Sequence, residues 1–341
     1  VSRYLDSRSE PAASVSAPEA AQADAPKLEV HFLDIGQGDS ALLFCGDETL
    51  LIDGGKVKNN QKLIARLKEL EVDHLDAVIC SHPDEDHCGG LSAVLASTRT
   101  DAFYCSVDSW HTKAFSDVTK YVEQQGISVT VPQAGDTFAF SDASVEFLGP
   151  VVDYGDDPNE GSLVARVRYG ETSFLFTGDM GFEAEDDMLA AGVDVSATVL
   201  KVAHHGSAGS SSTEFLQAVH PQYAVISVGA DNDYGHPTEA ALNRLAACGI
   251  PVYRTDLLGE IIAVSDGKTV TITSASNEAP PASDAASQTT GSYGYVGNSS
   301  SKVVHLAGCG KLPGESNRVY FASLDEALAA GYRKHASCLG S

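Results

Sequence analysis

The feature that most constrains the fold is a group of four potential metal ligands within six residues, directly after an apolar segment. The apolar segment is Leu75–Cys80, and the six residues read His82-Pro83-Asp84-Glu85-Asp86-His87. A short apolar run predicts a buried strand, so the ligands lie where that strand ends. Imidazole and carboxylate groups bind zinc, manganese or iron. A polar loop with two solvated histidines is the alternative, but it does not explain four potential ligands at this spacing.

Other potential ligands follow apolar segments in the same way. Asp53, Asp179 and the pair His204-His205 each come directly after a run of mostly apolar residues. Either aspartate alone is a common turn former. As a set, these residues favour one metal site, because neighbouring strand ends can bring distant ligands to one edge of a sheet core.

The order of the predicted elements indicates a layered α/β domain. Strands are expected at residues 28–35, 40–45, 50–52, 75–80, 144–148, 163–169, 173–176, 197–202, 224–228 and 251–254. Helices are expected at residues 61–70, 91–96, 183–190, 212–218 and 238–248. Hairpins come first and strands then alternate with helices, which suits sheets inside and helices outside.

Two segments rich in Ala, Ser and Pro divide the chain of 341 residues. Residues 1–27 are expected to be a flexible tether and residues 274–292 a linker, leaving a body at 28–273 and a tail at 293–341. Such tethers are common in secreted proteins, and the chain starts at Val1, so we expect an extracellular or cell-surface protein whose leader is not visible. No stretch approaches 18 apolar residues, so no transmembrane segment is expected. The seven cysteines are mostly isolated and indicate thiols, not a disulfide framework.

The formal charge of −25 argues against a protein that coats nucleic acid through a broad basic surface. It does not exclude a nuclease, because a metal site supplies its own positive charge.

The order of these motifs resembles the metallo-β-lactamase superfamily. The motifs are Asp53-Gly54-Gly55, the segment His82–His87, Gly178-Asp179 and His204-His205-Gly206-Ser207. Residues 32–40 (FLDIGQGDS) and 234–237 (YGHP) are similar more narrowly to the hydrolase domain of ComEC-type competence proteins. The resemblance covers nearly all of residues 28–273 and implies an αββα sandwich with a metal-dependent hydrolase site.

Two departures from the wider superfamily bear on the metal. Asp84 stands where the superfamily has a second histidine, as in the competence group. The separate third-motif histidine has no counterpart, since His111 falls too early, and Asn159 occupies a similar place. One metal position is therefore rich in oxygen ligands, which suits Mn²⁺ or Mg²⁺. We do not expect β-lactam hydrolysis.

The resemblance implies a site for one or two divalent metals, manganese or zinc. Asp86, His87 and one of His204 and His205 would hold one metal, and the other histidine of the pair is free to donate to phosphate. His82 and Asp84 would favour a second metal, with Asp179 bridging. A metal-activated water then attacks a phosphodiester without a Ser or Cys nucleophile.

Further residues have two open roles each. Asp86 and His236 are the candidate catalytic residues, although His236 has a structural role as its alternative. The candidates for orienting ligands or contacting substrate are Asp34, Asp39, Asp53, Asn159 and Ser207. The alternative is a turn role for Asp34 and Asp39 and a helix-cap role for Ser207 and the serines after it.

The tail has two pairs of potential zinc ligands. His305-x₃-Cys309 and His335-x₂-Cys338 enclose a spacer of 25 residues. This pattern predicts a structural zinc, which a module of this size needs for stability. The alternative is two unrelated histidines and two free thiols.

The tail resembles the small zinc domain of the Ada DNA-repair protein, which implies a zinc-stapled α+β domain. The family's four cysteines are here His305, Cys309, His335 and Cys338. His305 takes the place of the methyl-accepting cysteine, so methyl transfer is not expected. A structural or DNA-binding role remains, with Lys302, Arg318 and Arg333 as phosphate contacts or as a solvated face.

Three functions fit the sequence. The first is a metal-dependent phosphodiesterase, a secreted or surface DNase acting on single- or double-stranded DNA. The second is a hydrolase of small or cell-wall phosphodiesters such as phosphorylcholine esters, which the acidic body fits better. The third is a DNA- or cell-wall-binding protein with an inactive hydrolase fold, which the intact ligand set disfavours. Oligomeric state has no signature in the sequence.

Overall fold

The body is built from two packed β-sheets. The computed structural model describes residues 27–230, 232–276, 295–306, 311–314, 317–321 and 324–335. The first sheet has eight strands in the order β15-β14-β1-β2-β3-β4-β5-β6. Its strands are β1 (Leu28–Phe32), β2 (Ala41–Cys45), β3 (Glu48–Ile52), β4 (His74–Cys80), β5 (Arg99–Cys105), β6 (Val129–Thr130), β14 (Ile261–Ser265) and β15 (Val270–Ser274).

The second sheet has seven strands in the order β13-β12-β11-β10-β9-β8-β7. Its strands are β7 (Thr137–Phe140), β8 (Ala143–Gly149), β9 (Val164–Tyr169), β10 (Thr172–Phe176), β11 (Val199–Lys201), β12 (Tyr223–Ile226) and β13 (Val252–Arg254). Strands β10 to β13 run parallel, as do β3 to β6 of the first sheet. Parallel neighbours place their carboxyl ends at one edge, which is where the site forms.

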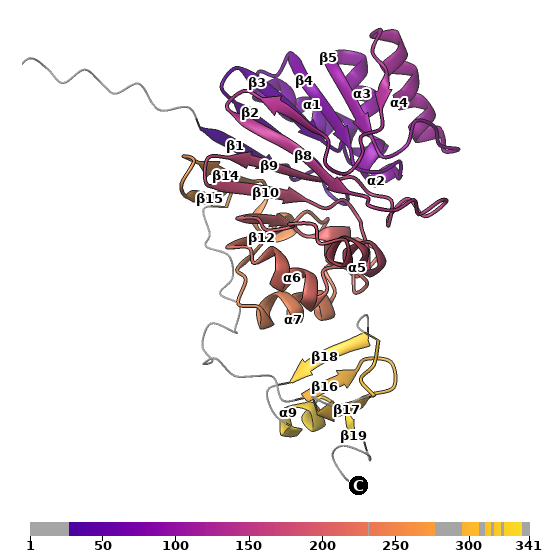
Figure 1. The fold of residues 1–341 in the computed structure, drawn as a ribbon, viewed down its shortest axis with the longest axis vertical. Helices are drawn as coiled ribbons and strands as arrows, with labels where there is room; N and C mark the ends of the chain where they lie inside the picture. The colour runs from indigo at the N-terminus through magenta and orange to yellow at the C-terminus, as the bar shows by residue number, and fades with distance from the viewer. Residues whose placement is uncertain are drawn as a thin grey trace, which may run out of the picture.

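Helices cover the outer face of each sheet, as Figure 1 shows. The first sheet is covered by α1 (Asn60–Glu69), α3 (Leu91–Ser97) and α4 (Lys113–Gln124), and the second by α5 (Phe182–Ala190), α6 (Thr213–Val219) and α7 (Glu239–Ala247). Short elements complete the body: η1 (Val57–Asn59), α2 (Glu85–Cys88), η2 (Ala203–Gly206) and α8 (Thr255–Leu258).

Alternation along the strands explains this layering. In β4, Val78 packs outward with the helices, whereas Ala77 and Ile79 pack inward between the two sheets. Phe147 and Phe176 of the second sheet meet them in the same inner cluster. Because successive side chains of a strand point to opposite faces, each central strand is buried on both sides. The predicted αββα sandwich is therefore confirmed.

Some elements of the body differ from the sequence-based prediction. The hairpin of β14 and β15 was not expected, yet it pairs with β1 and extends the first sheet. Figure 1 shows these two orange strands beside indigo β1. Ser274, assigned above to the linker, is the last residue of β15. Strand β5 and helix α4 also lack a predicted counterpart. No helix in the described part of the chain has the length and apolarity needed to cross a membrane.

The tail contains both strands and a helix. Strands β16 (Tyr295–Asn298), β17 (Val303–Leu306), β18 (Arg318–Phe321) and β19 (Arg333–Lys334) form a sheet in the order β18-β16-β17-β19, accompanied by α9 (Leu324–Ala329). Val304, Phe321 and Tyr332 belong to its small apolar cluster. A core of this size explains why an additional staple would stabilise the tail.

Candidate metal centre

The site lies where parallel strands of both sheets end. Asp53 follows β3 and His82 follows β4 in the first sheet. Asp179 follows β10 and His205 follows β11 in the second sheet. The sandwich thus brings together side chains that are far apart in the chain, such as Asp53 and His205.

Close backbone contacts hold the loop that contains Asp86 and His87. The amide of Asp39 donates to the carbonyl of Asp86 at 3.0 Å, and the amide of Gly54 donates to the carbonyl of His87 at 2.7 Å. At Gly38, φ is +131° and an added Cβ would lie 2.4 Å from the Asp86 carbonyl oxygen. Glycine is therefore required at residue 38 for the two loops to approach each other.

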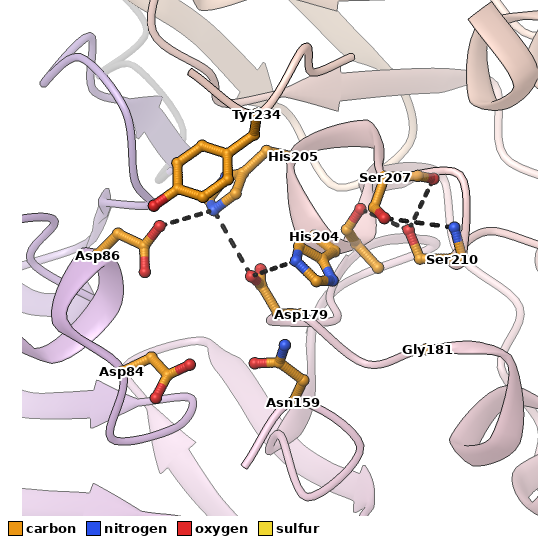
Figure 2. A network of polar contacts seen from close by, with 12 residues as sticks. Asp84, Asp86, Asn159, Asp179, Gly181, His204, His205, Ser207, Ser210 and Tyr234 are labelled. Carbon is orange, nitrogen blue, oxygen red and sulfur yellow. Dashed lines mark hydrogen bonds and ion pairs between the residues drawn. The ribbon is translucent and has the colours of Figure 1, made fainter. Parts of the chain in front are cut away.

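Four buried residues form the centre of the site. Asp39, His87, Asp179 and His205 each offer a ligand atom, and these atoms lie within 4.8 Å of one another. His87 Nε2 lies 3.0 Å from Asp179 Oδ1, and His205 Nε2 lies 3.6 Å from Asp179 Oδ2. Figure 2 shows Asp179 between His204 and His205.

The other ring nitrogen of each buried histidine has a partner behind the site. His87 Nδ1 lies 2.9 Å from Asp53 Oδ2, and His205 Nδ1 donates to the carbonyl of Ser227 at 2.9 Å. These contacts fix both rings with Nε2 toward Asp179. Such orientation of a histidine through its second nitrogen is typical of metal ligands.

Asp39 connects His205 to a buried lysine. Its Oδ2 lies 2.6 Å from Lys201 Nζ and its Oδ1 lies 3.0 Å from His205 Nδ1. Burial works against the charge of Asp39, but Lys201 and His205 outweigh it and lower its pKa to about 2. Since both oxygens face these partners, Asp39 orients His205 and balances the charge of Lys201.

The histidine nitrogens and the carboxylate oxygen that face the centre of the site fit a divalent cation. His82 Nε2, His87 Nε2, His205 Nε2 and Asp179 Oδ1 are buried and make no hydrogen bond within the described chain. Such atoms cost free energy unless a ligand satisfies them. Burial alone would lower the pKa of His205, yet Asp179 and Asp39 raise it to about 10, and Asp179 and Asp53 likewise raise the pKa of His87. The carboxylates therefore attract positive charge, and a metal would replace the protons.

Three oxygen-bearing side chains lie around this centre. Asp86 Oδ2 lies 3.7 Å from His205 Nε2, and Asp84 Oδ2 lies 3.9 Å from His82 Nε2. Asn159 Oδ1 is buried without a hydrogen-bond partner in the described chain. Figure 2 shows Asp84 and Asn159 near each other and on the same side of Asp179. A metal position rich in oxygen ligands remains a prediction from the sequence, and these side chains place oxygen atoms near the four buried residues.

His204 and His205 occupy different environments. The side chain of His205 is 2% exposed and that of His204 is 31% exposed. Both have positive φ, 51° and 52°, so the backbone turns sharply after β11. The structure thus places His205 in the buried centre. His204 lies at the rim, with its ring centroid 5.5 Å from that of His236. Burial and the two neighbouring histidines lower the pKa of His236 to about 4.

Two of the predicted residues have other partners. Asp34 pairs with Lys62 at 2.9 Å and accepts from the amide of Gly36, so its contacts are those of a turn. The hydroxyl of Ser207 accepts from the amide of Gly209, and Ser212 caps α6. None of these bonds joins Asp34 or Ser207 to the four buried residues at the centre of the site.

In the tail, the structure brings His305 and His335 together. Their ring centroids lie 4.1 Å apart, and His305 Nδ1 is buried without a hydrogen-bond partner in the described part of the chain. The other two expected zinc ligands, Cys309 and Cys338, lie outside the described residues.

Sequence reasoning missed three contributors to the site. Ser81 donates its hydroxyl to Asp53 at 2.7 Å and lies 3.1 Å from His82 Nδ1. Lys201 is a charged residue within an apolar strand, and this contrast could have marked it as a functional residue from the sequence alone. Tyr234 was noted only as part of a motif, and its place beside the site follows from the fold.

Comparison with known proteins identifies the family. The family model of the Metallo-beta-lactamase superfamily matches residues 33–230. Among curated proteins, ComE operon protein 3 of Bacillus subtilis is 31% identical over 68% of this chain and 32% of its own length. Competence protein ComA of Neisseria gonorrhoeae is 35% identical over 67% of this chain and 31% of its own length. This chain therefore spans about a third of the length of these relatives.

Among solved structures, the metallo-beta-lactamase fold protein YhfI of Bacillus subtilis matches 70% of this chain and 100% of its own, with a TM-score of 0.49 and 14% identity. The superfamily consists generally of metal-dependent hydrolases, and the four-residue cluster described above is a candidate site for such a metal. The chain belongs to the metallo-beta-lactamase superfamily, and the two curated relatives named above are ComEC-type competence proteins.

Proposed function

We propose that the protein is a metal-dependent phosphodiesterase that cleaves DNA outside the cytoplasm. The observation that carries the proposal is the convergence of His87 Nε2 and His205 Nε2 on Asp179, at buried atoms that make no hydrogen bond within the described chain. A cation held there supplies an activated water and neutralises phosphoryl oxygens. The names of the competence relatives support DNA as the substrate.

The chain's own residues have distinct tasks in this proposal. Asp53 and Asp39 keep His87 and His205 oriented toward the metal. At the rim, His204 lies 3.6 Å from Asp179 and is partly exposed, so it is placed to donate to a phosphoryl oxygen. His236, with a pKa of about 4, is neutral at pH 7 and contacts the substrate through a hydrogen bond rather than a charge.

Cleavage of labelled DNA tests the proposal. Wild type loaded with Mn²⁺ or Zn²⁺ is incubated with single- and double-stranded DNA, beside Asp86→Ala. We expect cleavage by wild type and a loss of at least about 100-fold in rate for Asp86→Ala, because a ligand or water contact is removed. The matched control is Asp117→Ala, which removes an exposed aspartate of α4 that pairs with Lys113. Absence of cleavage by wild type, or equal cleavage by Asp86→Ala, contradicts the proposal.

A second candidate is a hydrolase of small or cell-wall phosphodiesters. The observation in its favour is the net charge of −25, which repels a polyanion more than a small substrate. Turnover of a chromogenic phosphodiester without cleavage of any DNA would support this candidate.

For the tail, we propose a structural zinc held by His305, Cys309, His335 and Cys338. The 4.1 Å separation of the two histidine rings supports it. Metal analysis of the full chain would detect this zinc as an equivalent that is lost in His305→Ala and kept in His205→Ala.

A further inference from the structure

An exposed tyrosine lies beside the metal centre. Tyr234 is 58% exposed, and of the Phe, Tyr and Trp side chains that the structure describes it alone is exposed. An aromatic side chain of this size is usually buried or half-buried, so its exposure beside a candidate catalytic site points to a ligand contact. Figure 2 shows its ring on the same side of the site as Asp86 and His205.

Contacts of the ring and of the backbone hold Tyr234 in place. Its ring stacks on His236, with centroids 5.8 Å apart and planes inclined by 24°. Its amide donates to Asn232 Oδ1 at 3.1 Å, and the same oxygen accepts from the amide of His236 at 3.0 Å. The loop is also tied to the metal-ligand turn, since the amide of Thr238 donates to the carbonyl of Gly206 at 2.9 Å. The ring is therefore preorganised.

One lysine links this ring to the metal ligands. Lys56 Nζ donates to the Tyr234 hydroxyl at 3.2 Å and lies 4.9 Å from the ring centroid. The same Nζ lies 3.9 Å from Asp86 Oδ2. A ring that attracts a base and a cation that attracts a phosphate thus lie together at the edge of the site.

We propose that Tyr234 stacks on the nucleobase next to the scissile phosphodiester, with Lys56 contacting the adjoining phosphate. This inference rests on the proposed phosphodiesterase and assigns it a nucleotide substrate with an unpaired base. Aromatic stacking of single-stranded bases is a general mode of recognition and works with any base. A base inside a duplex is already stacked and does not reach the ring unless it leaves the helix.

The position of Lys56 disfavours choline at Tyr234. A quaternary ammonium group binds an aromatic face through cation–π attraction. Here the ammonium group of Lys56 already lies 4.9 Å from the ring centroid, so a second cation would be repelled. The phosphate of a nucleotide is negatively charged and is therefore attracted to the ammonium group of Lys56.

Two chromogenic diesters with the same leaving group test this assignment. The p-nitrophenyl ester of thymidine 5′-phosphate carries a base, and p-nitrophenyl phosphorylcholine carries a quaternary ammonium group. The full chain loaded with Mn²⁺ should show a kcat/KM at least about tenfold higher for the thymidine ester, the size expected for one stacking contact. Tyr234→Leu should lose most of this ratio through a higher KM, whereas Tyr234→Phe, which keeps the ring, should retain it.

The outcomes separate this inference from the proposed function. Turnover of both esters with equal efficiency, or the same ratio in Tyr234→Leu and Tyr234→Phe, overturns the stacking assignment and leaves the phosphodiesterase in place. Preference for the choline ester overturns it in favour of a choline site. Failure of the metal-loaded wild type to hydrolyse either ester overturns the phosphodiesterase, and the stacking assignment falls with it.

Discussion

Two neighbouring histidines show that the environment of a residue, and not its chemistry alone, decides the role to which it is suited. His204 and His205 have the same chemistry, and both have left-handed backbone conformations. His205 is buried between Ser227, Asp39 and Asp179, whereas His204 lies at the rim beside His236. A buried imidazole with one nitrogen engaged and the other facing carboxylates is suited to hold a metal. A partly exposed imidazole is suited to contact substrate.

Alanine substitutions at these two positions should therefore have different effects. We expect His205→Ala to lower the affinity for Mn²⁺ by more than about 100-fold, beyond the 10- to 100-fold typical of residues that only orient a ligand. His204→Ala should bind the metal like wild type and lose kcat. Titration calorimetry with Mn²⁺, together with the kinetics of a chromogenic phosphodiester, measures both. The reverse order of metal affinities would show that His204 is the ligand.

At the scale of elements, helices α5 and α7 hold the loop between η2, which contains His204 and His205, and α6. Glu185 of α5 is fully buried and accepts from the amides of Ser211 and Ser212. Arg244 of α7 is also buried and donates to the carbonyls of Ser210 and Ser211 at 2.6 and 2.8 Å. The loop after His205 is thus fixed from both sides by the buried side chains of Glu185 and Arg244.

The titration of Glu185 should make stability depend on pH. Burial raises its pKa to about 7 from a usual 4.5, although Ser212, Ser211 and Arg244 act in the opposite direction. Because the folded state keeps a proton that the unfolded chain loses, this contribution is present below pH 4.5 and is lost as the pH rises to 7. The loss is about 3 kcal/mol, taking about 1.4 kcal/mol per pKa unit.

Urea unfolding of wild type and Glu185→Gln between pH 4.5 and 7.5 measures this contribution. The glutamine variant does not titrate at this position, and the difference between the two proteins cancels the other groups. We expect the stability of wild type relative to the variant to fall as the pH rises. A difference that stays constant with pH would show that Glu185 has an ordinary pKa in the folded state.

At the scale of the whole molecule, the candidate metal site draws its residues from both sheets. The first sheet supplies His87 after β4, and the second sheet supplies Asp179 and His205 after β10 and β11. A metal bound there would therefore stabilise the packing of one sheet against the other. A ligand that binds only the folded state at 100 times its Kd contributes about 2.7 kcal/mol.

Removal of the metal should lower the thermal stability of the full chain. We expect treatment with a chelator to lower Tm by about 5–10 °C, since 1 kcal/mol corresponds to about 2–4 °C in a domain of 150–250 residues. Differential scanning calorimetry with and without added Mn²⁺ measures the shift. His205→Ala should show a much smaller shift, which separates this site from any zinc in the tail. Equal Tm values for wild type with and without chelator would contradict the prediction.

The sequence by itself determined the layered fold and the motifs of the site. Apolar runs of strand length, and potential ligands directly after them, are local patterns, so a layered α/β domain and the candidate metal-binding loop His82–His87 followed without a structure. The αββα sandwich itself was implied by the resemblance of the motifs to the metallo-β-lactamase superfamily. The hairpin of β14 and β15 could not be predicted in this way, because its strands join the first sheet only by pairing with β1, which is far away in the sequence. Propensity describes a strand's neighbours in sequence and not its neighbours in a sheet.

Only the tertiary structure decided which residues share the site. It placed His205 in the centre and His204 at the rim, paired Asp34 with Lys62, and brought Lys201 and Tyr234 to the site. These outcomes depend on burial and on distances between residues far apart in the chain. The physical reason is that the charge and the reach of a side chain act through space, whereas a motif records only its order along the chain.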